Sequence, residues 1–441
     1  MDARRKWSLN ADVVVVGGGA AGVAAAVTAA RQGMRVILLE KYGFCGGGAV
    51  AGLSGTICGL YEASDSLTAA PKQVVFGFAD EFVKLLESKG GLAPAVRYGK
   101  TFTRVHEPLV WRDVADHVLR EAGVQVFLHA TVIEVLMEGG ERIDGVVAYT
   151  KEGQVSIRAN VTIDASGDAD VVAMAGLGAF VGRDGQVQNP TMIFRLQGVD
   201  VDKFFATYGH DTILPPRVSQ AISDADASGN YVLPRKKIWA FATTRPGELL
   251  CNCTRIIGGD GRELNTLFAN DFTEAEMEGR LQLREYARFF KDKLAGCENS
   301  YVNDSAVQVG VRQTRQVLGR YVLSNADVVK GQKFSDGIAR SPWPIELHAG
   351  DKPRVEWLLD DYYEVPYRCF VPEQGSGLLV AGRCLSAEHE AVASARVTAQ
   401  CFSYGQAIGL AAAMATHNHI LPGEIDGAEL RRELNGTGAE L

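Results

Sequence analysis

Three glycines and one acidic residue near the start of the chain have the types and spacing of a dinucleotide-binding site. Gly17, Gly19 and Gly22 follow the pattern G-x-G-x-x-G, and Glu40 comes about 20 residues later. In such a motif the first glycine allows a tight turn, the second lets backbone approach a pyrophosphate, and the third lets a helix pack closely on a strand. The Glu40 carboxylate is placed to accept the hydroxyls of an unphosphorylated ribose, which favours FAD or NAD over NADP.

The segments around these glycines predict the elements that must position them. Four consecutive valines at residues 13–16 are typical of a buried parallel strand. An alanine-rich helix is predicted as far as about Gln32, and its N-terminus offers N–H groups and a positive dipole end to a pyrophosphate. Gly33 ends this helix, and a second strand is predicted at residues 36–39. Because this context accompanies the glycines, we expect a dinucleotide site rather than a glycine-rich turn without a ligand.

The composition is that of a soluble globular protein without a nucleic-acid or membrane partner. The 441 residues include 45 Lys and Arg against 53 Asp and Glu, which gives a formal charge of −8. Nucleic acid and anionic membrane both need a concentrated basic surface, which this balance does not favour. The eight cysteines include no C-x-x-C pair, so we expect free thiols, a cytoplasmic protein and no metal site. A homo-oligomer is left open.

The order of predicted elements indicates an α/β fold with a discontinuous domain. Short alternating runs between residues 132 and 163 are typical of a β-meander, and a buried strand is expected at 161–165. The strand–helix alternation then gives way to arginines, aromatics and irregular loops, and it returns at residue 378. We therefore predict a Rossmann-type domain with a parallel sheet and a β-meander, formed by residues 1–180 and 361–441. An inserted α+β substrate domain would comprise residues 181–360.

Further elements follow from periodicity. They are helices at 76–89, 107–120, 273–294 and 391–416, and strands at 124–128, 191–196 and 238–242. The glycines of GLGAFVG, residues 176–182, could suggest a second dinucleotide turn. The preceding residues 168–175 are better interpreted as a short helix that ends at Gly176, so a dedicated nicotinamide domain is not expected.

Six stretches of the chain carry a resemblance to a known family. They are VVVVGGGAAGVAAA, EKYGFCGGGAVAGL, TIDASGDADVVAMAG, VGVRQTRQVLGRYVL, RSPWPIELH and LLVAGRCLSAEHEAVASARVTAQCFSYGQAIG. The chain resembles the bacterial FAD-dependent oxidoreductases of the glutathione-reductase-like, two-dinucleotide-fold flavoprotein superfamily. The resemblance spans nearly the whole chain but is weak between about residues 200 and 300. It implies FAD as cofactor and a small-molecule substrate that exchanges a hydride with flavin N5, and it leaves the electron acceptor open.

The resemblance also implies which residues contact FAD. They are Gly17, Gly19, Ala20, Ala21, Gly22, Glu40, Lys41, Gly46, Gly47, Gly48, Ala49, Val132, Ala165, Ser166, Gly167, Gly382, Arg383, Gly405, Gln406 and Ala407. The last three are expected to face the flavin pyrimidine from a helix N-terminus, where the dipole stabilises the negative charge of reduced flavin. Where many such flavoproteins have Gly-Asp, this chain has Gly382-Arg383. Arg383 suits a phosphate, and ribityl binding by an acid is left open.

Four residues are candidates for the chemistry itself. His389 lies before the last long helix, where an imidazole could take a substrate proton while hydride leaves to the flavin; the alternative is a histidine that packs the loop. His348 is placed similarly by the resemblance. Arg312 and Arg396 could clamp a substrate carboxylate or stabilise the flavin anion with their guanidinium forks, and salt bridges are the alternative. For Arg315, a solvated helix face is the preferred interpretation.

Other functions stay open at this point. A redox-neutral FAD enzyme, such as a hydratase or isomerase, would need no electron acceptor, and an NAD-binding dehydrogenase would use the same glycine motif. A flavin-dependent RNA-modifying enzyme begins similarly but needs a basic surface. A nucleotide-sensing protein would show no bleaching of flavin by a substrate. Cys45 is interpreted as a small buried thiol, with a covalent link to flavin as the alternative.

Overall fold

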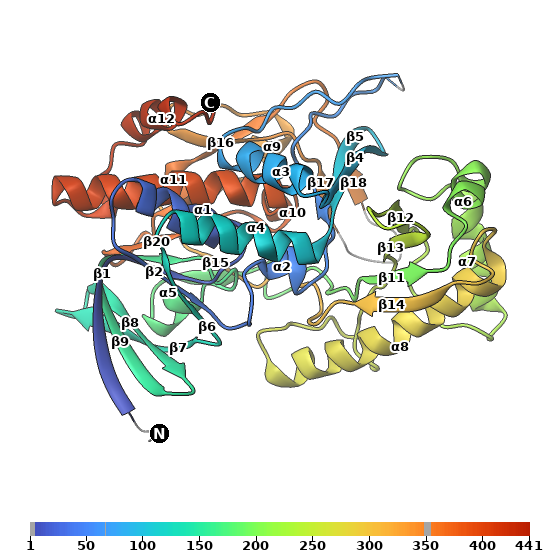
Figure 1. Ribbon diagram of the computed structural model, residues 1–441, viewed down its shortest axis with the longest axis horizontal. Helices are drawn as coiled ribbons and strands as arrows, with labels where there is room; N and C mark the ends of the chain where they lie inside the picture. The colour runs from blue at the N-terminus through green and yellow to red at the C-terminus, as the bar shows by residue number, and fades with distance from the viewer. Residues whose placement is uncertain (1–4, 67, 348–353) are drawn as a thin grey trace.

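The structure is a computed structural model that describes residues 5–66, 68–347 and 354–441. Figure 1 shows two regions side by side. The N-terminal elements in blue and the C-terminal elements in red lie together on the left, and the green and yellow elements from the middle of the chain lie on the right. None of the described helices is both long enough and apolar enough to cross a membrane.

The left-hand region is built on a seven-stranded sheet with the order β6-β2-β1-β9-β8-β7, in which β20 also pairs with β9. The strands are β1 (Arg5–Val16), β2 (Val36–Glu40), β6 (Gln125–Leu128), β7 (Thr131–Glu138), β8 (Arg142–Thr150), β9 (Gly153–Asp164) and β20 (Leu378–Val380). Strands β6, β2, β1, β9 and β20 are parallel, whereas β7, β8 and β9 form an antiparallel meander. The predicted α/β fold is confirmed.

Strand β9 joins the meander to the parallel sheet. It pairs in parallel with β1 from Gly153 to Asp164. On its other edge, its first half pairs antiparallel with β8, and residues Thr162 to Asp164 pair in parallel with β20. The sequence predicted a meander followed by a separate buried strand. The structure makes them one strand because burial changes from alternating to continuous at Val161 without an intervening turn.

Two helices pack closely over the sheet. They are α1 (Ala20–Arg31), which follows β1, and α11 (Thr398–Asn418) near the C-terminus. A Cβ atom on Gly405 would lie 2.1 Å from the carbonyl oxygen of Ala21, and one on Gly409 would lie 2.3 Å from that of Ala25. Only glycine permits so close an approach of the two backbones.

Shorter helices complete this region. They are α2 (Gly47–Val50), α3 (Phe78–Ser88), α4 (Pro108–Glu121), α5 (Asp170–Met174), α9 (Asn325–Val329), α10 (His389–Ala395) and α12 (Gly427–Gly436), with 3-10 turns at Tyr367–Phe370 and Pro422–Glu424. Helix α5 ends before Gly176, which has a φ of +68°. The prediction of a short helix there, rather than a second dinucleotide turn, is therefore confirmed.

The right-hand region contains a four-stranded antiparallel sheet with the order β12-β13-β11-β14. Its elements are β11 (Phe194–Gln197), α6 (Val201–Tyr208), α7 (Pro216–Ala227), β12 (Trp239–Ala242), β13 (Glu248–Asn252), α8 (Ala269–Lys293) and β14 (Tyr301–Ser305). The predicted strands and the long helix are present with shifted ends.

Four smaller sheets complete the described part of the structure. Their strands are β3 (Thr56–Ile57), β4 (Leu92–Tyr98) and β5 (Thr101–His106) in one sheet, and the pairs β10 (Ala179–Val181) with β15 (Arg315–Val317), β16 (Gly337–Ser341) with β19 (Tyr363–Pro366), and β17 (Ile345–Leu347) with β18 (Arg354–Glu356). Strands β4 and β17 contribute one residue each to the cavity described below.

The packing divides the chain differently from the sequence-based domain boundaries. One hydrophobic cluster takes its residues from 11–172 and 317–434, and a second takes most of its residues from 192–309. The sequence assigned residues 181–360 to the inserted domain, whereas Val317, Leu323 and Ile338 pack in the first cluster. We propose that the inserted segment ends near residue 310 rather than at 360.

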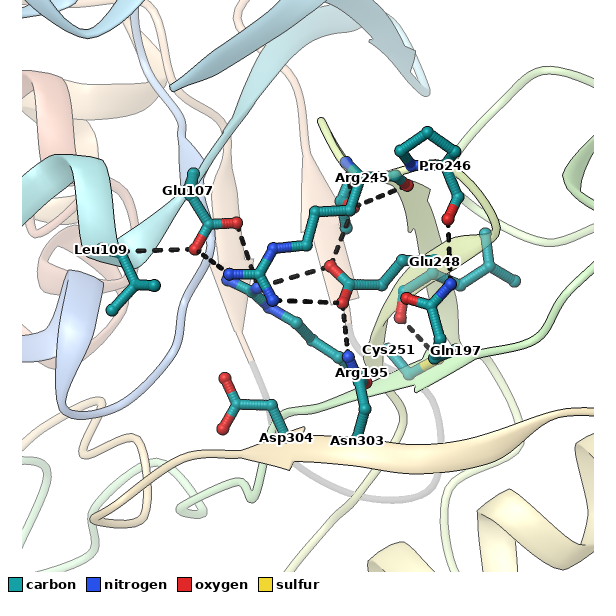
Figure 2. Close-up of polar contacts among 12 residues, drawn as sticks. Glu107, Leu109, Arg195, Gln197, Arg245, Pro246, Glu248, Cys251, Asn303 and Asp304 are labelled. Atoms are coloured by element: carbon teal, nitrogen blue, oxygen red, sulfur yellow. Dashed lines mark hydrogen bonds and ion pairs between the residues drawn. The ribbon is translucent and has the colours of Figure 1, made fainter. Parts of the chain in front are cut away.

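A buried ion network joins the two regions (Figure 2). Arg195 of β11 lies between two carboxylates, with Nη1 at 3.2 Å from Glu107 Oε2 and 3.3 Å from Glu248 Oε1. Glu107 Oε1 also caps α4 by accepting the N–H of Leu109, and the same oxygen accepts from Arg245 Nη2 at 2.9 Å. Because Arg195 and Glu248 are removed from water, each carboxylate depends on its guanidinium partner.

The network predicts a large loss of stability when its central cation is removed. In Arg195→Met, Glu107 and Glu248 lose a buried counter-charge, and we expect the free energy of unfolding to fall by about 3–5 kcal/mol. Urea unfolding followed by circular dichroism measures this change. The control Lys203→Met breaks an exposed pair with Glu298 and should cost less than about 1 kcal/mol. A loss in Arg195→Met as small as in the control would contradict this role.

Candidate functional site

A cavity of about 350 Å³ is lined by residues from both regions. Most residues that the sequence assigned to a cofactor lie in its wall. These are Gly17, Gly19, Ala20, Ala21, Glu40, Lys41, Gly46, Gly47, Gly48, Ala49, Val132, Ala165, Ser166, Gly167, Gly382 and Arg383. The structure therefore brings together residues from the segments 17–49, 132–167 and 382–383 around one cavity.

The glycines in and next to the cavity wall are needed for two different reasons. A Cβ on Gly22 would lie 1.8 Å from the carbonyl oxygen of Gly17, and one on Gly17, where φ is +102°, would lie 2.4 Å from that of Ala165. Protein packing explains these two. In contrast, a Cβ on Gly19 would meet nothing nearer than Gly47 at 3.9 Å, and one on Gly48 would meet nothing within 4 Å. Their missing side chains leave open space beside the N-terminus of α1, where N–H groups favour phosphate.

Glu40 holds the turn together from the end of β2. Its Oε2 accepts the N–H of Gly18 at 2.7 Å, and its Oε1 accepts the N–H of Tyr42 at 2.9 Å. Burial raises the pKa of Glu40, while these two N–H donors favour its ionised form. Each carboxylate oxygen has a second acceptor position, so Glu40 retains capacity for ligand hydroxyls.

Arg383 is paired with an acid that the sequence did not single out. Its Nη2 lies 2.7 Å from Asp168 Oδ1, and its Nη1 donates to Thr314 Oγ1 at 3.0 Å. Burial by itself raises the pKa of Asp168, but the charge of Arg383 and the hydroxyl of Thr314 outweigh it, so the pKa is lowered. Both Asp168 and Arg383 line the cavity. The sequence predicted only the cation, Arg383, whereas the structure adds the carboxylate of Asp168.

Tyr98, Arg312, Glu346 and Arg396 form another part of the cavity wall, which we call the basic subsite. Arg312 Nη1 donates to the carbonyl oxygen of Asn189 at 2.6 Å, and Arg396 Nη2 lies 3.2 Å from Gln188 Oε1. Burial lowers the pKa of Arg396 to about 10 and lowers that of Arg312 as well. An anion bound between Arg312 and Arg396 would stabilise the charged form of both guanidinium groups.

The same subsite contains a carboxylate–phenol pair. Tyr98 at the end of β4 donates its hydroxyl hydrogen to Glu346 Oε1 of β17 at 2.6 Å. Burial raises the pKa of Tyr98, and the charge of Glu346 raises it further, so the phenol stays protonated. Sequence reasoning missed this pair because its members lie 248 residues apart. The stretch RSPWPIELH, which contains Glu346, was the available signal.

Four predicted cofactor residues lie away from the cavity wall. Gly22 packs in the β1–α1 turn, and Gly405, Gln406 and Ala407 lie inside α11 rather than at its start. The expected single helix is broken between α10 and α11, so the helix N-terminus that lines the cavity is at Val397 and Thr398.

Gln406 instead has a structural role. Its side-chain oxygen accepts the N–H of Phe78 at 2.9 Å, and its amide nitrogen donates to Thr437 Oγ1 at 3.0 Å. The expectation that residues 405–407 lie at a helix N-terminus is therefore corrected, because α11 begins several residues earlier and places this turn against α1 and α3. Their contact with the flavin stays a prediction.

Of the two histidine candidates, His389 does not form part of the cavity wall. His389 is the first residue of α10 and faces the backbone near Gly182, beside an ion pair between Glu390 and Arg183. Burial lowers the pKa of His389. The interpretation as a packed loop histidine is therefore the better one. His348 lies outside the described residues.

Two further candidates are accounted for by local contacts. Arg315 donates to the carbonyl oxygen of Asp168 and to Asp170 Oδ1, so it pairs with α5 rather than lying on a solvated helix face. Cys45 is buried against Gly18, does not line the cavity, and burial raises its pKa. Within the described ranges, no cluster of His, Cys, Asp and Glu side chains could hold a metal ion.

Comparison with known proteins agrees with this arrangement. A family model described as FAD dependent oxidoreductase matches residues 12–434. The chain belongs to the FAD-dependent oxidoreductase family. No curated protein matches the chain in a sequence comparison.

Solved structures show the same fold at low sequence identity. A geranylgeranyl bacteriochlorophyll reductase-like protein from Thermoplasma acidophilum has a TM-score of 0.50 at 14% identity, covering 98% of this chain and 85% of its own. The flavin-dependent brominase Bmp2 has a TM-score of 0.51 at 14% identity, covering 97% and 83%. The cofactor of this family member is FAD, and the open glycines of the cavity fit a group that carries a pyrophosphate.

The two open glycines allow a test of the cofactor site that does not disturb folding. In Gly48→Ala the new methyl group meets no protein atom but enters the cavity, so we expect FAD affinity to fall by about tenfold or more while unfolding is unchanged. Flavin fluorescence titration of the flavin-stripped protein and thermal unfolding measure the two quantities. Gly436→Ala, at an equally open helix position outside the cavity, is the control. Equal FAD affinity in both variants would contradict the assignment.

Proposed function

We propose that this FAD-dependent oxidoreductase transfers a hydride between a C–H bond of a small organic anion and flavin N5. Bound FAD supplies the redox chemistry, and the chain supplies orientation, a proton site and a fixed electrostatic field. The observation that carries the proposal is that one cavity contains both the glycine-lined nucleotide site and two buried arginines.

The residues of the basic subsite have distinct roles in this proposal. Arg312 and Arg396 orient an anionic substrate through guanidinium forks in a region of low dielectric constant. Phe241 and Trp343 line the same cavity and exclude water. Glu346 holds the hydroxyl proton of Tyr98 at Oε1, and this pair can accept or return a substrate proton as the hydride moves.

The experiment that tests the function begins with the visible spectrum of the purified protein. We expect a flavin spectrum that moves to the supernatant after acid precipitation, because Cys45 does not reach the cavity. Anaerobic mixing with small organic acids should then bleach the flavin. Product formation without any acceptor would instead indicate a redox-neutral FAD enzyme, and bound FAD that no candidate substrate bleaches or reoxidises would oppose the proposal.

A substitution in the basic subsite should weaken substrate binding specifically. In Arg396→Met, loss of a charge-assisted hydrogen bond should raise the substrate concentration for half-maximal flavin reduction by roughly tenfold to a hundredfold. Stopped-flow absorbance under anaerobic conditions measures it. Arg396→Lys keeps the charge without the fork and should fall in between. Arg280→Met, on the exposed face of α8, is the control. An unchanged concentration dependence in Arg396→Met would remove Arg396 from the substrate site.

A further inference from the structure

A third buried arginine stands behind the basic subsite. Arg235 precedes β12, is 2% exposed, and donates from Nη1 to Asn252 Oδ1 at 3.0 Å. Asn252 in turn lines the cavity. The guanidinium carbon of Arg235 lies 4.4 Å from the ring centroid of Trp239, a cation–π contact. The side chain of Asn252 therefore lies between Arg235 and the cavity where the substrate is proposed to bind.

The charges of the three arginines act on one another. Burial lowers the pKa of Arg312, and the positive charges of Arg235 and Arg396 lower it further. The negative charge of Glu346 opposes this effect at each of the three arginines. Glu346 is thus near enough to act on all three arginines, and Tyr98 donates to it.

The described residues of this cluster do not balance in charge. Arg235, Arg312 and Arg396 supply three positive charges, and Glu346 supplies one negative charge. The thiols of Cys58 and Cys401 add no negative charge to the cluster. Burial raises the pKa of the Cys58 thiol to about 11 and that of the Cys401 thiol to about 12, so both stay protonated. Arg383, which also acts on Arg396, is already paired with Asp168. Counted over the described residues, two positive charges are left over in a buried setting, where unpaired charge is costly.

Unused hydrogen-bond donors point to the same ligand chemistry. Among the described residues, Arg396 Nε and Arg235 Nη2 are buried and have no acceptor. Arginine is a donor only, so these groups can be satisfied by an acceptor and not by a cation or a donor. Phe241, Trp343 and Ile193 bound the same space with apolar surface and limit the size of what enters.

Resting on the hydride-transfer function proposed above, we propose that the substrate is a small organic dianion, whose two negative charges are matched by Arg235, Arg312 and Arg396 around Glu346. Two carboxylates on one short carbon chain or a phosphate monoester meet this requirement. The charge surplus makes a neutral or singly charged substrate a poorer match than a doubly charged one.

The test measures binding of matched anions to the FAD-loaded protein by isothermal titration calorimetry. Malonate, succinate and glutarate are each compared with their monoamide, which has the same length and one charge fewer. At least one dicarboxylate should bind ten times or more tightly than its monoamide. Inorganic phosphate and methyl phosphate form a second arm, and tight binding there with weak dicarboxylates assigns the dianion to a phosphate monoester.

Substitutions test whether the preference for dianions depends on the three arginines. Arg235→Met should remove most of the dianion advantage, Arg235→Lys should keep it, and Arg280→Met on the exposed face of α8 should leave it unchanged. The proposal is overturned if no dianion binds more tightly than its singly charged partner, or if Arg235→Met folds and keeps the full advantage. Flavin bleaching by a neutral or singly charged substrate would overturn it too, while leaving the proposed hydride transfer intact.

Discussion

The position of helix α1 is the constraint on which the rest of the structure depends. Its first turn is held against the end of β1 by the contact between Gly22 and the backbone of Gly17, and its flank is held against α11 by Gly405. Neither contact tolerates a side chain. Because the N-terminus of α1 is fixed on two sides, its N–H groups are held in one orientation beside the cavity.

The second region is anchored to this frame through charge. Glu107, the N-cap residue of α4, lies in the first region, whereas Arg195 and Glu248 lie in the second. Their contacts form a buried ion network between the two regions. Residues from both regions line the cavity. The proposed nucleotide part is formed by backbone and glycine, whereas the proposed substrate part is formed by long charged side chains.

The local parts of the site could be predicted from the sequence, and the parts made by distant segments could not. The glycine motif, Glu40 and the parallel strands follow from patterns within about 30 residues, the length of a βαβ unit. The break between α10 and α11 left no glycine or proline signal, so Gly405 was misplaced and His389 was assigned to the cavity. Tyr98 and Glu346 meet only because β4 and β17 converge in space. Arg312 and Arg396 were found by residue type, but their shared surroundings come from tertiary packing.

The thiols in the cavity wall have a consequence for oxidative damage. Cys58 and Cys401 both line the cavity, and burial raises the pKa of each. Thiolates, and not thiols, react readily with hydrogen peroxide, the product that forms when reduced flavin meets oxygen. Because burial favours the protonated form of both thiols, we expect sulfenic acid to form slowly at these sulfur atoms. The same burial that suits this wall to the proposed hydride transfer is thus expected to make it resistant to hydrogen peroxide.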